Sequence, residues 1–334
     1  MKRVIACTLI PLLVLAACGG SNSGNIGGGV NNPPPAAGFS ITPTNGLAVA
    51  KVTYQSAVSS GEVASLAGSG ITADNGGGFN KPTVTNQHGG TLATLLQKVP
   101  LPPATTPCAN AGSVTVTLDV ADILLLGSGA LSSGDTILAE YDICDEGLGE
   151  IIDGTIDSVV DAFEGNIFAF AYDMTMTMDL VDFSATTDTD AVTVNGDGTA
   201  TLKLLQAPYV EASVSGNLLA TVTHSTSETL TNFSSAQTYD GRVVPSPSTL
   251  SAAGTLDSSE LAGVVSYSTP VLFEAFDTNY PHVGELLVVS DGSSARLIAQ
   301  PNAVDVVIEI YSNATGTGAP DSTINTTWAE LTAL

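Results

Sequence analysis

From Cys108 to its C-terminus the chain is a series of short runs in which apolar and polar residues alternate. In residues 112–120, Val114, Val116 and Leu118 take one face, while threonine and aspartate take the other. Period 2 is typical of a strand with one buried face. The pattern recurs, with many β-branched residues, and predicts strands at residues 135–143, 209–216, 218–225, 263–269, 284–290, 294–300 and 304–311.

Between these runs lie segments rich in Gly, Asn, Asp and Ser, at residues 133–135, 195–198, 215–217 and 290–294. Such residues supply the positive φ that hairpin turns require. Since no long helical pattern intervenes, we expect a mainly β fold, a large antiparallel meander. A sheet of this size must curl, close or split, so it is a curved sheet, a sandwich or a half-barrel.

Three segments favour helix instead. Apolar positions at helical spacing predict a helix over residues 44–67, capped by Thr44 or Asn45, and one or two turns over residues 91–99. Residues 323–334 predict a short C-terminal helix capped by Thr326 or Thr327. Residues 150–165 fit both a helical stripe and an alternating strand, and their Ile, Val, Thr and Gly content favours strand.

Methionines alternate with threonines in Met174–Met178, which places three thioethers on one face of a strand. Soft sulfur ligands suit Cu(I), whereas flexible apolar side chains suit a core. The core interpretation is favoured, because Ala169, Ala171 and Leu180 bracket a strand whose inward face needs flexible apolar side chains.

Charge narrows the classes of partner. Only 12% of the 334 residues are charged, and 33 acidic residues stand against 8 basic ones, for a net charge of −25. No basic stripe exists that would bind phosphates, so we do not expect the protein to bind nucleic acid. The apolar content of 43% is ample for a core.

The N-terminus has the form of a secretory signal, with Lys2 and Arg3 before an apolar stretch over residues 4–15. It ends in Leu15-Ala16-Ala17-Cys18, which resembles the lipobox of bacterial lipoproteins. The resemblance implies cleavage before Cys18, lipidation of Cys18, and a membrane anchor. By the same resemblance, Gly19 favours the outer membrane of a Gram-negative bacterium.

The expected organisation follows from this N-terminus. Residues 1–17 form the signal peptide, and residues 18–43 hold the lipidated cysteine and a Gly/Asn/Pro tether, whose first twenty residues reach about 25 Å. Residues 44–107 form a helical or irregular portion, and residues 108–334 form the antiparallel β domain.

Removal of Cys7 with the signal and lipidation of Cys18 leave Cys108 and Cys144 as a pair. An exported location permits disulfides, so the two are expected to be bonded across neighbouring strands. The closed loop of about 37 residues corresponds to about 4 kcal/mol in the chain-entropy estimate.

Candidate chemistry is sparse. Acidic clusters offer oxygen ligands for Ca²⁺, although none matches the EF-hand spacing; the candidates are Asp145, Glu146, Asp153, Asp157, Asp188, Asp190 and Asp197. The three histidines, His88, His224 and His282, lie in no metal or nucleophile motif, and no catalytic residue can be singled out. No other cofactor is indicated.

The sequence therefore predicts a lipid-anchored envelope or binding protein that is not an enzyme, with a protein or glycan partner that it does not identify. Two alternatives stay open: a periplasmic carrier of lipid or another hydrophobic ligand, and a glycan-acting hydrolase using a carboxylate pair.

Overall fold

The computed structural model describes residues 38–67, 71–74, 81–84, 104–122, 126–145, 150–167, 169, 171–187, 191–205, 209–222, 226–277 and 279–332. Its helices are α1 (Gly46–Ala67) and α4 (Trp328–Thr332). Its strands are β1 (Ile71–Asp74), β2 (Lys81–Val84), β3 (Ala104–Pro107), β4 (Ala111–Asp119), β5 (Thr136–Asp145), β6 (Glu150–Asn166), β7 (Ala171–Thr187), β8 (Ala191–Leu205), β9 (Tyr209–Val222), β10 (Ser227–Asp240), β11 (Pro247–Ser258), β12 (Val265–Phe276), β13 (Val283–Ser290), β14 (Ser293–Ala299), β15 (Asp305–Tyr311) and β16 (Ser322–Thr327).

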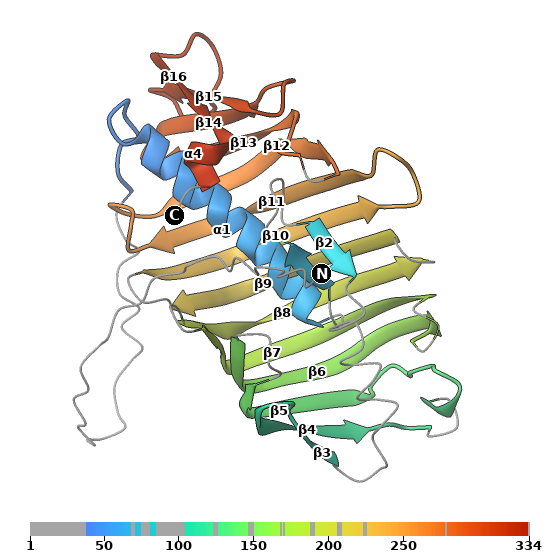
Figure 1. Ribbon diagram of the computed structural model, residues 1–334. Coiled ribbons are helices and arrows are strands. Elements are labelled where there is room, and N and C mark those ends of the chain that lie inside the picture. Colours follow the sequence, from blue (N-terminus) through green and yellow to red (C-terminus); the bar gives the residue numbers. More distant parts are fainter. Residues whose placement is uncertain are drawn as a thin grey trace, which may run out of the picture.

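One antiparallel sheet of 14 strands dominates the fold. Its strands run in sequence order from β3 to β16, each paired with the next, and the sheet is open, while β1 and β2 form a separate hairpin. Figure 1 shows the strands stacked in this order, with α1 lying diagonally across one face. The predicted antiparallel meander is confirmed, as a single open sheet.

Several strands are longer than the alternation predicted. Residues 195–198 and 215–217 were expected to form turns, but they lie inside β8 and β9. The register between these strands shifts between Asp197 and Thr199, and Gly196 has a φ of 155°. A glycine-rich segment therefore serves here as an irregularity within a long strand pair, because a β-bulge and a turn favour the same residues.

The predicted turns at residues 133–135 and 290–294 lie between strands. Asp291 and Gly292 have φ of 42° and 74°, and they join β13 to β14 in a tight hairpin. The ambiguous residues 150–165 lie in β6, which confirms the strand interpretation. It pairs with β5 on one side and with β7 on the other.

We call the face that carries α1 the inner face and the opposite one the outer face. Inward side chains form one apolar core that extends from β4 to β15, with α1 and α4 packed on it. Met174, Met176 and Met178 are each at most 2% exposed and belong to this core. The core interpretation of the methionines is confirmed.

Helix α1 begins close to the predicted position. The Asn45 carbonyl accepts the first helical bond, from Val49 N, but the Asn45 side chain turns back and accepts a bond from Thr42 N at 2.7 Å. Its amide side chain therefore closes the preceding turn. Residues 91–99, predicted to include a helical turn, lie outside the described residues.

The C-terminal prediction was correct in its second half. Residues 322–327 form strand β16, and the helix is confined to α4. Thr327 caps it: Glu330 N donates to Thr327 Oγ1 and Thr327 N donates to Glu330 Oε2, both at 3.2 Å. This reciprocal pair is a capping box, and it seats Trp328 and Leu331, which are fully buried.

Cys108 and Cys144 form a disulfide, with 5.5 Å between their Cα atoms and a sequence separation of 36. The bond joins the segment between β3 and β4 to the end of β5, and it confirms the pair that the cysteine count predicted. Residues 1–37 lie outside the described part, so the signal peptide, Cys18 and most of the tether stay predictions.

Candidate functional site

The predicted calcium ligands that lie in the described ranges form no metal-binding group. Asp145 Oδ2 accepts a hydrogen bond from Asn110 Nδ2 at 3.4 Å, and Asp153 Oδ1 accepts one from Ile143 N at 3.3 Å. Glu146, Asp188 and Asp190 lie outside the described residues. In the described part of the chain, no three His, Cys, Asp or Glu side chains form a group that would hold a metal ion.

Two of the candidates, Asp157 and Asp197, belong to an acidic row on the outer face. Asp157 of β6 is directly opposite Asp179 of β7, and Asp179 is directly opposite Asp197 of β8. All three are exposed. Like charges directly opposite one another across strands repel, so the row costs stability.

The described histidine lies in an aromatic contact. The imidazole of His282 stacks on Phe276, with ring centroids 4.7 Å apart and planes 18° apart. It directly precedes β13. His88 and His224 lie outside the described residues.

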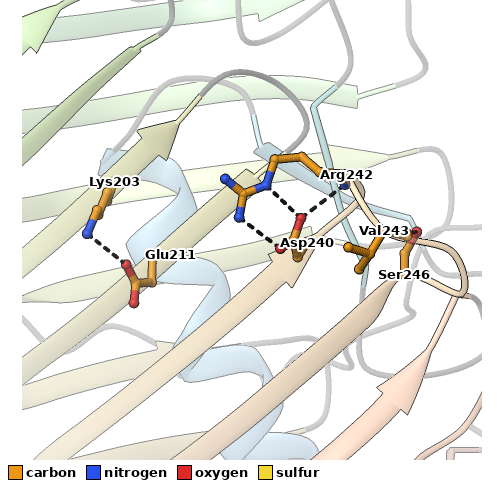
Figure 2. Close-up of polar contacts among 6 residues, drawn as sticks. All are labelled: Lys203, Glu211, Asp240, Arg242, Val243 and Ser246. Carbon is orange, nitrogen blue, oxygen red and sulfur yellow. Dashed lines mark hydrogen bonds and ion pairs between the residues drawn. The ribbon is translucent and has the colours of Figure 1, made fainter.

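The most distinctive surface feature is the loop between β10 and β11, residues 241–246, shown in Figure 2. Arg242 binds Asp240 through two parallel bonds, from Nε to Oδ1 and from Nη2 to Oδ2, each 2.8 Å long. This bidentate pair lowers the pKa of the partly exposed Asp240 carboxyl. The guanidinium also lies 4.2 Å from the ring centroid of Tyr209, so a cation–π contact holds it further.

A second ion pair stands next to this one on the outer face. Lys203 Nζ of β8 lies 3.5 Å from Glu211 Oε2 of β9 (Figure 2). Two of the few basic side chains of this acidic protein are therefore held at the same end of the sheet. Both are partly exposed, so each pair contributes little to stability.

The far side of the loop is fixed as firmly. Ser246 N donates to Asp277 Oδ1 at 2.9 Å, and Asp277 N donates to Ser246 O at 2.8 Å. Ser246 Oγ also donates to Val243 O at 3.2 Å. The loop is thus ordered from both ends by its own hydrogen bonds.

Between these fixed ends the loop presents apolar side chains to solvent. Val243 is 48% exposed, and Val244 is 91% exposed, the highest fraction among the exposed large apolar side chains. The same end of the sheet carries further exposed apolar side chains at strand ends and turns. We call this set the apolar rim: Leu205, Val243, Val244, Phe276, Val283 and Val304.

Sequence reasoning did not find this rim. The one local signal was a Val-Val pair before Pro245 in a segment of turn residues, where no buried strand face was predicted. The remaining members come from strands distant in sequence. Only the register of β8 to β15 shows that they share one end of the sheet.

Scans against family models, curated proteins and solved structures find no match to this chain. None of the helices in the described ranges combines the length and the apolar character needed to cross a bilayer. The functional argument therefore rests on the molecule's own surfaces.

Proposed function

We propose that this protein is an exported, lipid-anchored, non-catalytic binding protein of the bacterial envelope that docks a partner through its apolar rim. The observation that carries the proposal is Val244, which is 91% exposed on a loop held at both ends by hydrogen bonds. An exposed apolar patch on a soluble surface is typical of an interaction site.

The order of the loop supports the same conclusion. A flexible loop loses conformational entropy when a partner immobilises it, which weakens binding. Here Arg242 and Ser246 already fix the loop. The binding cost that remains is small, so the apolar side chains at the tip act as preorganised anchors.

The place where the N-terminal chain joins the fold supports an orientation of the apolar rim relative to the proposed anchor. Phe39 N donates to Ser290 Oγ at 3.1 Å, and Ile41 N donates to Ser293 Oγ at 2.7 Å. The chain therefore joins the fold at the β13–β14 turn, whereas the apolar rim lies at the other end of these strands. The eight residues of β13 separate the two ends by about 27 Å. We place the partner on the side away from the anchor.

Two further features support export and a binding role. The Cys108–Cys144 disulfide is typical of an oxidising compartment, in agreement with the lipobox at Cys18. The inner face, where a permanently hollow carrier would hold its ligand, is crossed by α1 (Figure 1). The partner therefore meets an outer surface.

The anchor is tested by metabolic labelling with an alkyne fatty acid and by fractionation. Wild-type protein should carry the label and sediment with the outer membrane, whereas Cys18→Ser should be unlabelled and soluble. A labelled Cys18→Ser protein would contradict lipidation at this residue.

Docking is tested by photo-crosslinking in the producing cells, with a benzoylphenylalanine residue at position 244. Position 222 is the matched control, because Val222 is also an exposed valine, at the opposite end of the sheet. We expect a discrete adduct from position 244 and none from position 222. The adduct should weaken at least tenfold when Val243→Asp is added. Equal adducts from both positions would exclude the rim as the docking surface.

A further inference from the structure

Helix α1 is held on the sheet by two different kinds of contact. Its first half ends at Tyr54, whose ring lies 5.5 Å from that of Phe273 and 5.0 Å from that of Trp328. Trp328 in turn donates from Nε1 to Pro281 O at 3.0 Å. The first half is therefore locked into an aromatic cluster that also holds α4.

From Ser56 onward the helix combines apolar and polar contacts: Ala57 and Val58 join the apolar core, whereas Ser56 contacts polar groups of the sheet. Ser56 Oγ is 2.7 Å from Glu228 Oε2 of β10, and Ser258 Oγ of β11 is 3.3 Å from Glu228 Oε1. Glu228 of β10 thus contacts both the helix and the neighbouring strand β11. It lies on the inner face, beside apolar core positions such as Leu230.

The geometry at Ser56 depends on the proton of Glu228. Ser56 Oγ is also 3.0 Å from Val52 O, and a hydroxyl has one proton, so it can donate to only one of the two oxygens. If Glu228 is protonated, its carboxyl donates to Ser56 Oγ while Ser56 donates to Val52 O. If Glu228 is ionised, one of these bonds is lost and a charge is left beneath the helix.

The interface between α1 and β10 contains buried polar groups without partners. Thr53 Oγ1, Ser235 Oγ and Gln237 Nε2 are buried and have no hydrogen-bond partner among the described residues. Ser235 and Gln237 lie directly under Gly61: a Cβ there would be 3.0 Å from Ser235 Oγ and 2.0 Å from Gln237 Nε2. Buried polar groups without partners weaken this part of the interface.

The surroundings of Glu228 raise the pKa of its carboxyl overall. Burial raises the pKa of the Glu228 carboxyl, and the nearby carboxylate of Glu260, in the turn after β11, raises it further, while the hydrogen bonds of Ser56 and Ser258 lower it. Tyr267 of β12 also faces this group; burial raises the pKa of its phenol, so it stays neutral. The protonated form of Glu228 is therefore favoured in the docked structure.

We propose that α1 from Ser56 onward is a latch that releases from the strands beneath it when Glu228 loses its proton and uncovers an apolar floor. The floor consists of inward side chains such as Leu230, Phe233 and Leu250. The aromatic cluster at Tyr54 keeps the first half of the helix in place and acts as the hinge. This inference does not depend on the apolar rim.

The sign of the pH dependence follows from the raised pKa. A carboxyl whose pKa is higher in the docked state stabilises that state fully below its ordinary pKa, and the contribution disappears as pH rises through the raised value. The latch is therefore closed in mild acid and opens toward neutral pH.

The experiment uses full-length Cys18→Ser protein and Nile red, an uncharged dye that fluoresces in apolar surroundings. Between pH 4.5 and pH 8 we expect dye fluorescence to rise several-fold. Fluorescence of the single tryptophan, Trp328, should stay constant, because the aromatic cluster does not move. In Glu228→Gln the dye signal should stay low at every pH, and Glu260→Gln should shift opening to lower pH.

Two controls make the test independent of that one variant. Glu274→Gln, an exposed glutamate on β12, should keep the wild-type profile. Oxidised Gly61→Cys with Ser235→Cys should staple the helix to β10 and keep the dye signal low at pH 8. The same pH profile in Glu228→Gln as in wild type, or dye binding by the stapled protein, would overturn the latch.

Discussion

At the residue scale, backbone geometry decides which positions tolerate change. Gly154 of β6 has a φ of +102°, and a Cβ there would be 2.3 Å from Asp182 O of β7. Gly154→Ala should therefore lower the free energy of unfolding by at least about 1–3 kcal/mol, the usual cost of such strain. Denaturant unfolding measures it.

Gly127→Ala is the control for this prediction, because a Cβ at Gly127 meets nothing within 4 Å and no positive φ is required there. Its effect should stay within about 0.5 kcal/mol, as for most surface substitutions. Equal stability of the two variants would mean that the strand irregularity at Gly154 relaxes freely.

The sequence predicted residues well where one property decides the environment. Alternation placed Met174, Met176 and Met178 inward, and the cysteine count paired Cys108 with Cys144. It failed at Gly196, because a glycine signals a special backbone conformation without saying whether a turn or a bulge supplies it. Glu228 gave no signal either, since only the fold brings it under Ser56.

At the element scale, the acidic row on β6, β7 and β8 is a source of repulsion. Asp179 lies directly between Asp157 and Asp197 on the exposed face. Asp179→Asn should therefore raise the free energy of unfolding by about 0.2–1 kcal/mol at low salt, the usual size of a cross-strand pair. The gain should shrink at 0.5 M NaCl, because salt screens exposed charges.

Glu211→Gln provides the comparison of opposite sign. It removes the partner of Lys203, 3.5 Å away on the same outer face, and should cost up to about 1 kcal/mol at low salt. If Asp179→Asn destabilised the protein instead, the row would have a bound cation as its partner, and added Ca²⁺ would raise the melting temperature of the wild type only.

The bounds of a helix or strand could be predicted only where a local sequence signal marks them. The sequence predicted β4 and β13 closely, because alternation marks both strands, and it identified Thr327 as a candidate cap of α4. Strand β16 was predicted as helix, since Thr and Asn in residues 323–327 carry no alternating apolar signal. Its place in the sheet comes from pairing with β15, which is a tertiary effect.

At the scale of the whole molecule, the 14-stranded sheet is a linear series of strands in sequence order. Each strand pairs only with its neighbours, and α1 packs mainly on β8–β11 and β13–β15. The strands β3, β4 and β5 lie at the far edge, beyond the reach of this helix (Figure 1). Cooperativity across such a chain of neighbours is local, so the disulfide stabilises an edge that α1 does not hold.

Two consequences follow from this placement of Cys108 and Cys144. The native protein should contain no free thiol other than Cys18 when that residue is unlipidated, as alkylation and mass spectrometry will show.

Cys108→Ser with Cys144→Ser should lower the stability of the edge by about 4 kcal/mol in the chain-entropy estimate. Hydrogen exchange should accelerate in β4 and β5 while β13–β15 keep their rates. A uniform acceleration in all strands would instead mean that the 14-stranded sheet unfolds as one unit, with the disulfide edge coupled to the strands under α1.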